Sequence, residues 1–443
     1  MDPHLAASAA PRKKTALYLS LPVMSWALYD FANTIFSSNI ITIFFPFYLS
    51  SVVGGSGQMD QIASTIISYA NAAVSILLVL LSPLYGVWID QTGKKKKYVV
   101  TFAAGAILST LLMSIFAQFS SSETFFSLPA SVFLVILAFM AGKFFYQSSL
   151  VFYDAMLPDV STKENLSLLS GFGVAVGYTG TILGLSVYFL TGKDNFSDAF
   201  LYSGVLFLLF SLPIMFIYRE KQPSGLQPAS KSGVFSGYRE IAATFKEIRA
   251  FRDLFLFMLA YFFFNDAIAT AIAMMAPYAT SVIGFSQGTF ILLYLTATVF
   301  SIIGSFSFGH YTKKAGSKMA LYMVGFLLVV ALLLAVFTTV ASLFWISGAL
   351  YGIAMGAMWV VTRTMIVEMS PPEKRGQFFG LFAFSGKVSA VAGPLVYGTI
   401  TLTFSSYGDI ASRLALGSML IFVAIGMIIL KYVNYGPFRQ QHM

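Results

Sequence analysis

The stretch GVWIDQTGKKKK, residues 86–97, joins two long apolar runs of the chain. Gly86 and Gly93 permit a tight turn here, and Lys94 begins a run of four lysines that would hold the turn on the cytoplasmic side of a membrane. Asp90 follows the first run, where it can reach a neighbouring helix N-terminus or a loop cation. We therefore expect two membrane helices joined by a short basic loop.

The composition of the whole chain agrees with a membrane location. Of its 443 residues, 57% are hydrophobic and only 10% are charged, whereas a soluble domain carries about 25% charged residues. The apolar runs are continuous, and many are long enough to cross a hydrocarbon core of about 30 Å as helices. The composition therefore predicts an all-α membrane protein that crosses the bilayer many times.

Several classes of chemistry are excluded by the residue types present. The chain has no cysteine, and its histidines are only His4, His310 and His442, far apart in the sequence. Disulfides, thiolate sites and histidine metal centres are therefore not expected. No phosphate-binding loop of an ATP-driven pump is present. We expect no catalytic site, no bound metal and no cofactor, so the protein should not be an enzyme.

Turn and charge signals divide the chain into twelve spans in two halves. An N-terminal six-helix bundle is expected over residues 1–218, a cytoplasmic linker with an amphipathic helix over 219–252, and a C-terminal six-helix bundle over 253–443. The predicted spans are residues 22–50, 62–89, 98–119, 130–157, 168–191, 199–218, 253–283, 287–309, 318–340, 342–369, 376–403 and 411–433.

Lys and Arg predict the orientation of these spans. They gather at alternate connections, which places both termini in the cytoplasm. The formal charge of +9 then reflects topology and contact with anionic lipid, and nucleic acid is not an expected partner. The outer loops nearly lack glycosylation sites, which favours a bacterial inner membrane over a vacuolar one. We expect a monomer whose partners are the bilayer and a small solute.

The two halves contain matching segments, as expected for an internal repeat. GHYTKKAGSK places Gly309 and Gly316 at the spacing of the first loop, with Lys313 in the position of its acid. One constant offset also aligns SGFGVAVGYTGTILG with FGLFAFSGKVSAVAG, and it brings Asp154 onto Arg363. Duplicated six-span halves are typical of transporters that bind their solute between the halves.

These motifs also resemble those of known families. The loop resembles the G-x-L-A-D-R-x-G-R-K signature of the major facilitator superfamily, with Trp88 and Gln91 as departures from it. WALYDFANTIF, YDAMLPDVS and SPPEKRGQFFGLFAFSGK resemble the vacuole-effluxer-like family, which includes autophagy-related vacuolar amino-acid exporters and bacterial relatives. The resemblance implies the twelve-helix fold, a central cavity lined by spans 1, 4, 7 and 10, and transport of amino acids or similar solutes.

Charged residues within the spans are the main candidates for function. A charge facing lipid is costly, so these residues should face a cavity or pair with one another. On this basis span 1 forms one wall of a polar cavity. The alternative is that they are interhelical salt bridges that fix the bundle. The candidates for binding the solute or a coupling ion are Trp26, Asp30, Asn33, Lys143, Gln147, Asn265, Asp266, Trp359, Arg363 and Lys387.

A gate is expected at the cytoplasmic ends of spans 4 and 10. Asp154 and Arg363 occupy equivalent positions there, and we expect them to pair when that side is closed. The loop residues Gly86, Asp90, Gly93 and Lys94 complete the predicted gate. Asp30 and Asp266 are the expected groups for any proton coupling.

The predicted function is secondary active transport of a small polar or zwitterionic organic solute, resembling an amino acid, by alternating access. Coupling to protons is left open. The runner-up is an exporter or importer of a larger amphiphile such as a drug, siderophore or small peptide. A receptor or scaffold without transport is the alternative from a different class.

Overall fold

The computed structural model describes residues 17–53, 57–119, 123–125, 128–191, 196–220 and 251–435. Within these ranges it contains twelve helices long and apolar enough to cross a membrane, and each predicted span falls on one of them. Residues 221–250, which hold most of the predicted linker and its amphipathic helix, lie outside the described residues. The proposed division of the chain at 219–252 therefore stays a prediction.

The first half contains six spans and two short extra elements. A single span of 33 residues is made by α2, the π-helix η1 and α3. A two-residue hairpin pairs Thr124 with Pro129 and Phe125 with Leu128. The elements are α2 (Leu21–Phe36), η1 (Ser37–Phe44), α3 (Phe45–Val53), α4 (Gly57–Thr92), α5 (Lys95–Gln118), β1 (Thr124–Phe125), β2 (Leu128–Pro129), α6 (Ala130–Asp154), α7 (Leu157–Val160), α8 (Leu166–Thr191), α9 (Phe196–Leu212) and η2 (Pro213–Ile217).

The second half also contains six spans. A short 3-10 turn precedes α15 and another precedes α16. The elements are α11 (Arg252–Ser281), α12 (Gln287–Ala315), α13 (Ser317–Phe337), α14 (Ala341–Met369), η3 (Pro372–Lys374), α15 (Arg375–Thr403), η4 (Ser405–Tyr407) and α16 (Asp409–Lys431).

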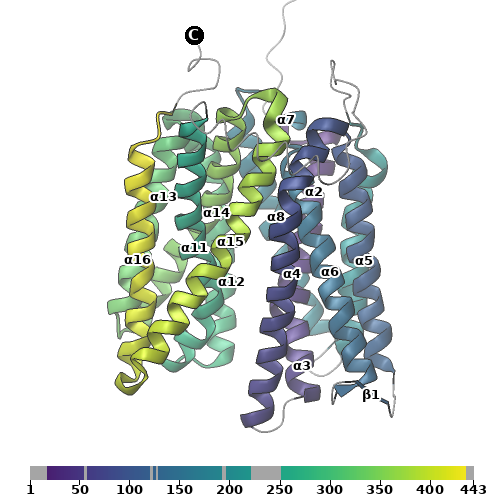
Figure 1. Ribbon diagram of the computed structural model, residues 1–443, viewed down its shortest axis with the longest axis vertical. Helices are drawn as coiled ribbons and strands as arrows, with labels where there is room; N and C mark the ends of the chain where they lie inside the picture. Colours follow the sequence, from purple (N-terminus) through teal and green to yellow (C-terminus); the bar gives the residue numbers. More distant parts are fainter. Residues whose placement is uncertain are drawn as a thin grey trace, which may run out of the picture.

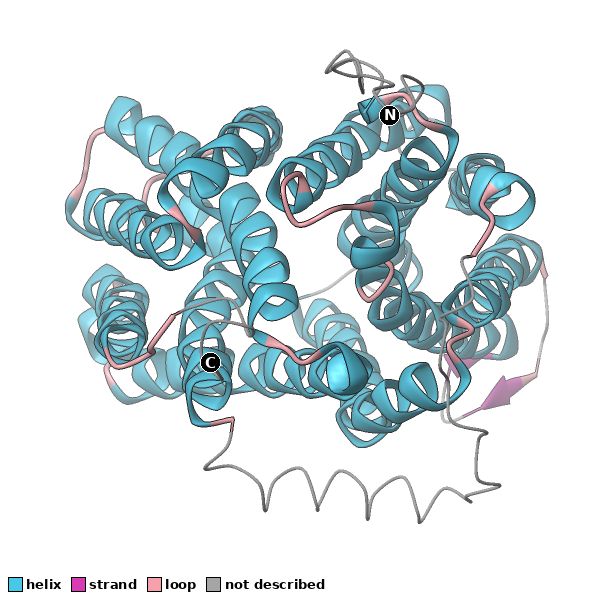
Figure 2. Cartoon of the chain, turned by 90° about the horizontal axis from the view of Figure 1, so that it is seen from above, coloured by secondary structure: helices cyan, strands magenta, loops and turns pink. Residues whose placement is uncertain are grey.

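The helices form two groups that follow the two halves of the sequence (Figure 1). Viewed from above, most of them appear nearly end-on, with the β1–β2 hairpin at the edge of the first group (Figure 2). We call the upper end in Figure 1 the basic face. There α4 and α12 end and α5, α13 and α15 begin, at residues that include Lys94, Lys95, Lys313, Lys314, Lys374 and Arg375.

Glycines end the two helices that carry the loop pattern. Gly93 follows α4 with φ 62°, and Gly316 follows α12 with φ 83°. An L side chain is strained at such angles, whereas glycine adopts them freely. The predicted turn role is therefore confirmed for Gly93 and Gly316, which set the direction in which the chain enters α5 and α13. It is wrong for Gly86, which lies inside α4 and packs against the backbone of α15 instead.

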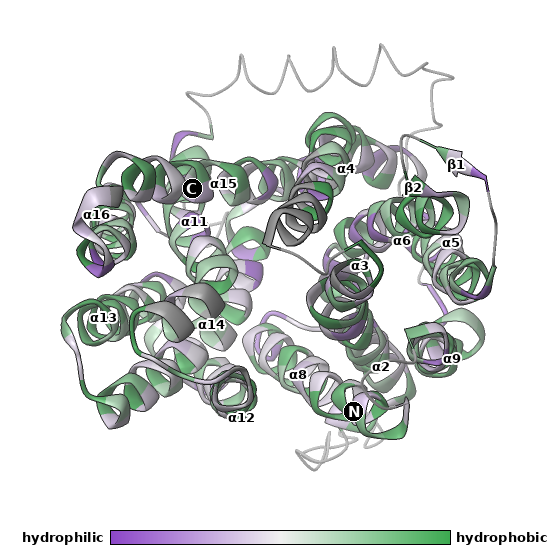
Figure 3. Cartoon of the chain, turned by 90° about the horizontal axis from the view of Figure 1, so that it is seen from below, coloured by the Kyte–Doolittle hydropathy of each residue, from purple (hydrophilic) through white to green (hydrophobic). Residues whose placement is uncertain are grey.

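Two helix crossings join the halves near the basic face. A Cβ added to Gly86 of α4 would lie 2.4 Å from the main-chain oxygen of Gly376 in α15, so the two backbones touch. Likewise, a Cβ on Gly309 of α12 would lie 2.8 Å from the main-chain oxygen of Ser167 in α8. Figure 3 shows α4 beside α15 and α8 beside α12, at two separate places between the groups. The repeat predicted from the sequence is therefore visible as two equivalent contacts.

The glycines of α8 let this helix pack closely on α2. A Cβ at Gly173 would lie 2.3 Å from the Trp26 ring, and one at Gly180 would lie 2.4 Å from the main-chain oxygen of Phe31. Small residues at this spacing are typical of closely packed membrane helices. Here they bring α2, at the turns that carry Trp26 and Asp30, against α8.

The π-helix η1 was not predicted from the sequence. Asn39 within it is fully buried, and its Nδ2 donates to the main-chain oxygen of Gly184 and to Ser203 Oγ, both at 2.9 Å. These bonds anchor η1 to α8 and α9. Short π-helical segments often occur at functional sites because they change the direction of side chains.

Replacing Gly86 by valine should disrupt the crossing of α4 and α15. The added side chain would overlap the α15 backbone, and overpacking of this kind costs about 1–3 kcal/mol. We expect a lower unfolding temperature in detergent. The matched control is Gly398→Val in α15, because a Cβ there meets nothing within 4 Å. Equal unfolding temperatures for the two variants would contradict the close approach.

Candidate functional site

A cavity of about 470 Å³ lies between the two halves. One end is formed by Asp154 and Arg363, toward the basic face, and the lining continues to Phe290 and Phe344 in the first turns of α12 and α14. The walls come from α2, η1, α6 and α8 on one side and from α11, α12, α14 and α15 on the other. A ligand held in this cavity would contact both halves at once.

Most of the predicted site residues line this cavity. The structure therefore brings together polar and charged side chains that are far apart in the sequence, on four helices. The lining includes Asp30, Asn33, Lys143, Gln147, Asp154, Trp359, Arg363 and Lys387.

Asp154 and Arg363 form an ion pair across the interface. Arg363 Nη2 of α14 lies 2.8 Å from Asp154 Oδ1 at the end of α6. The guanidinium carbon also lies 5.8 Å from the centre of the Trp26 ring and 5.5 Å from that of Tyr153. The contact predicted from the repeat is therefore present, and two aromatic rings support it.

Trp26 does not lie in the cavity wall, contrary to the sequence interpretation. It is fully buried behind Arg363, with its ring stacked on Tyr153 at 5.1 Å between centres. Its Nε1 donates to the main-chain oxygen of Tyr153 at 3.5 Å. Trp26 lies one helical turn before Asp30 in α2, closer to the basic face. At that level Arg363 of the other half packs near its ring, so no cavity remains there.

Asn265 and Asp266 are also outside the cavity lining, which corrects the expected position of both. Asn265 Nδ2 donates to Ser389 Oγ at 2.6 Å and to the main-chain oxygen of Gly386 at 3.1 Å. Asp266 is fully buried and accepts the N–H of Gly393 at 2.6 Å. These side chains point at α15 within the second half, because glycines there leave room for them.

Asp30 occupies a space that glycine leaves open in α8. A Cβ at Gly177 would lie 3.1 Å from the Asp30 carboxyl carbon. Asp30 interacts electrostatically with Arg363 and Asp154 and lines the same end of the cavity. Asp30 therefore lies in the cavity wall against α8, within electrostatic range of the Asp154–Arg363 pair.

Several buried polar atoms of the lining have no hydrogen-bond partner among the described residues. They are both side-chain polar atoms of Asn33, Oε1 of Gln147 and Nη1 of Arg363. Buried polar groups in native proteins are almost always satisfied, by protein, by water or by ligand. These atoms are therefore available to hold a polar solute or the water that precedes it.

Some lining residues were not identified from the sequence. Tyrosines line the cavity from both halves, and η1 contributes two polar side chains besides Ser37, which helical spacing places on the same face of span 1 as Asp30 and Asn33. Aromatic residues are common in membrane proteins at the lipid interface as well, so their number alone could not place them here. The residues not identified are Tyr146, Tyr178, Tyr294, Tyr351, Ser38 and Thr42.

Asp90 connects the loop motif to the other half. Its Oδ1 accepts the N–H of Gly376 at 2.7 Å, and its Oδ2 accepts the N–H of Gln377 at 2.8 Å. These are the first amides of α15, where a carboxylate is favoured by both the free N–H groups and the helix dipole. Of the two partners expected for Asp90, the helix N-terminus is therefore confirmed.

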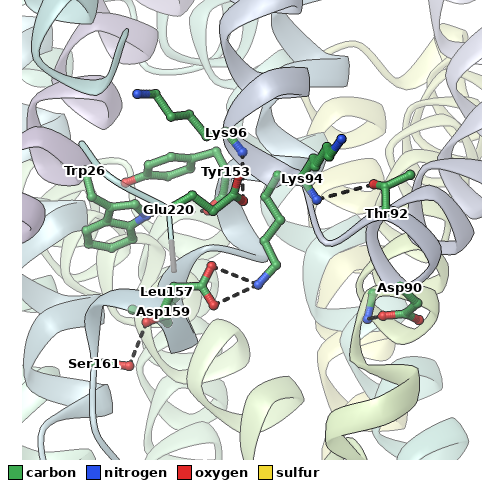
Figure 4. A network of polar contacts seen from close by, with 12 residues as sticks. Trp26, Asp90, Thr92, Lys94, Lys96, Tyr153, Leu157, Asp159, Ser161 and Glu220 are labelled. Carbon is green, nitrogen blue, oxygen red and sulfur yellow. Dashed lines mark hydrogen bonds and ion pairs between the residues drawn. The ribbon is translucent and has the colours of Figure 1, made fainter. Parts of the chain in front are cut away.

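Two lysines of the same loop, Lys95 and Lys96, contact other segments of the first half. Lys95 Nζ contacts both carboxylate oxygens of Asp159 at 2.9 Å, and Lys96 Nζ donates to the main-chain oxygen of Tyr218 at 2.6 Å. Figure 4 shows the two contacts at the Asp159 carboxylate and the bond between Lys96 and Glu220. The N–H of Lys96 donates to Glu220 at 3.1 Å, and burial raises the pKa of Glu220. Lys94 precedes α5, and its own N–H donates to Thr92 Oγ1 at 3.3 Å.

Comparison with known proteins identifies the family. The model of the family described as "Vacuole effluxer Atg22 like" matches residues 57–441. The chain belongs to this family. The MFS-type transporter YxiO of Bacillus subtilis (strain 168), itself uncharacterized, is 28% identical, with 92% of this chain and 94% of that protein covered.

A fungal member of the Atg22-like family is longer than this chain. Autophagy-related protein 22-1 of Aspergillus niger is 25% identical over 62% of this chain, which spans about half of that protein, 49%. The match therefore covers only about half of the fungal protein.

Solved structures show that this Atg22-like protein has the twelve-helix fold of the major facilitator superfamily. The human organic anion transporter MFSD10 has a TM-score of 0.72 at 13% identity, covering 95% of this chain and all of that one. A bacterial homologue of the iron transporter ferroportin in an outward-facing state has a TM-score of 0.71 at 15% identity, covering 93% and 99%. The protein is thus a multi-pass membrane protein with this fold.

Replacing Asp90 by alanine should destabilise this Atg22-like protein. Two backbone N–H groups at the start of α15 would lose their acceptor, and loss of a helix cap costs about 1–2 kcal/mol. The measurement is thermal unfolding of the purified protein. Lys313→Ala is the control, since this exposed residue holds the equivalent position in the second loop and should change stability by less than about 0.5 kcal/mol. Equal losses would contradict the capping role.

Exchanging the charges of Asp154 and Arg363 should distinguish the contribution of their ion pair to thermal stability from the contributions of the two individual side chains. Asp154→Arg and Arg363→Asp each place like charges side by side, and breaking one buried pair costs about 3–5 kcal/mol. The double variant restores opposite charges and should recover part of the lost thermal stability. A double variant no more stable than the weaker single one would show that the pair does not hold the halves together.

Proposed function

We propose that this Atg22-like protein is a secondary active transporter that moves a small polar or zwitterionic organic solute, resembling an amino acid, by alternating access. The observation that carries the proposal is the cavity between the two halves. Its lining combines carboxylates, ammonium groups, a guanidinium and aromatic rings. Its volume of about 470 Å³ is within the range of sites for small organic ligands.

The positions of the charges suit a solute with both an amine and a carboxylate. Asp30 would take the ammonium group, and Lys143 and Lys387 would take the carboxylate. Trp359 and Gln147 would close around the remaining part of the molecule. Asn265 and Asp266, which were also predicted to bind the solute, contact α15 instead. They would act on the solute only through that helix.

The side of the membrane to which the cavity opens follows from the orientation of the protein in the bilayer. If the basic face is cytoplasmic, as the lysines there favour, the gate of Asp154, Arg363 and the Asp90 loop is closed and the cavity extends toward the outside. Transport then requires the Asp154–Arg363 pair to separate while the opposite ends of the helices approach. We place the protein, as a monomer, in a bacterial inner membrane, in keeping with its similarity to YxiO.

Proton coupling, if it occurs, is proposed for Asp30 in preference to Asp266. Asp30 lines the cavity beside the gate, so that a change in its charge acts directly on Asp154 and Arg363. Asp266 instead holds the Gly393 amide of α15 and lies outside the lining. A larger amphiphile remains the second candidate, because tyrosines and Met355 add apolar surface to the lining.

Cysteine labelling can test alternating access, because the chain has no cysteine of its own. Thr42 lies in the lining and is exposed, whereas Ser170 is fully buried near the basic face. In right-side-out vesicles we expect Thr42→Cys to react with a membrane-impermeant thiol reagent and Ser170→Cys to stay protected. Substitution Asp154→Asn should expose Ser170→Cys to a reagent trapped inside, and reaction at the two sites should change in opposite directions.

Flux measurements complete this test. Proteoliposomes would be assayed for uptake of labelled amino acids, small peptides, nucleosides and siderophores, with Arg363→Ala as the inactive control. We expect saturable uptake of at least one amino acid. Binding of a solute without any flux would favour a receptor and overturn the proposal.

A further inference from the structure

The cavity lining contains more positive than negative charge. Its ionisable residues other than tyrosine are the acids Asp30 and Asp154 and the bases Lys143, Arg363 and Lys387. Arg363 is already paired with Asp154 at 2.8 Å, and Asp30 faces the same pair. The two lysines therefore remain as the source of the excess positive charge.

Neither lysine has an acidic partner within salt-bridge distance among the described residues. Lys143 of α6 is 7% exposed and donates to Asn71 Oδ1 of α4, a neutral amide. Lys387 belongs to α15 in the other half of the protein. The acid with which it interacts electrostatically is Asp154, which is already paired with Arg363 at 2.8 Å. The two ammonium groups line the same cavity and are close enough to repel each other.

Two like charges in a low-dielectric cavity favour a bound anion. A carboxylate between them would replace their repulsion by two charge-assisted hydrogen bonds. A neutral zwitterion would leave the lining with one uncompensated positive charge, whereas a solute of net charge −1 would bring the sum to zero. Resting on the proposed transport function, we infer that Lys143 and Lys387 form a clamp for a carboxylate and that the preferred solute is an organic anion.

The clamp also connects binding with movement of the halves. Lys143 is held by the first half and Lys387 by the second, so an anion between them attracts both. Without an anion, repulsion between the lysines keeps this part of the cavity open. Binding of the anion would thus favour the approach of the two halves around the solute.

Matched pairs of ligands test the charge preference directly. Thermal unfolding of the full-length purified protein would be followed with glutamate and glutamine, aspartate and asparagine, succinate and succinamate, and lactate and lactamide. Each pair has nearly the same shape and differs by one charge. We expect the anion of at least one pair to bind at least tenfold more tightly than its amide. If no anion binds more tightly than its amide, the inference is overturned.

Variants of the lysines test the site. Lys143→Gln and Lys387→Gln should each reduce the preference for the anion at least tenfold, whereas Lys387→Arg should retain it. Lys313→Gln, which removes an exposed charge on the basic face, is the control and should have no effect. An anion preference that survives both glutamine variants would place the anion elsewhere and overturn the clamp.

Flux in proteoliposomes separates this inference from the proposed function. Uptake of neutral amino acids that is unchanged in Lys143→Gln and Lys387→Gln would overturn the clamp and leave transport intact. Lysine-dependent binding of an anion with no flux of any solute would support the clamp and overturn the transport function. Circular dichroism and size-exclusion profiles would show that each variant is folded.

Discussion

The two halves of this protein meet through backbone contacts that only glycine permits. At Gly86 against Gly376, and at Gly309 against Ser167, a single added carbon would overlap the facing main chain. Because both contacts lie near the basic face, they bring the ends of α4, α8, α12 and α15 together there. The cavity, the ion pair at its end and the cap at the start of α15 all depend on this close approach.

The low dielectric of the membrane interior explains how the charges are distributed. A buried charge must be paired or solvated, and this chain uses both solutions. Asp154 pairs with Arg363 between the halves, and Asp266 accepts a backbone N–H within the second half. The charges that are not neutralised in this way, Lys143 and Lys387, face the cavity. In a closed core this charge would be costly, whereas in the cavity it would contribute to the proposed binding of a solute.

The sequence alone predicted the elements that depend on local pattern and on the repeat. The twelve spans, the turns at Gly93 and Gly316, the contact of Asp90 with a helix N-terminus and the Asp154–Arg363 pair were expected, whereas Gly86 was expected in a turn and lies inside α4. Helical spacing could not decide which face of α11 is turned to the cavity, so Asn265 and Asp266 were misplaced. The same limit applied to Trp26. Arg363 of the second half determines how far the cavity extends along α2, and the sequence of α2 carries no information about this contact. The π-helix η1 has no sequence signal comparable to a proline or a glycine turn.

The two copies of the loop are equivalent in backbone but not in charge. Asp90 places a negative charge at the start of α15, which its helix dipole favours, whereas the equivalent position of the second loop is the exposed Lys313. At the crossing of α4 and α15, a carboxylate of one half therefore accepts two backbone N–H groups of the other. On the α8 side, the halves are joined by close backbone packing on α12 and by the bond from Ser170 Oγ to the main-chain oxygen of Val360 in α14, so the two places where the halves meet differ in chemistry although they share one backbone pattern.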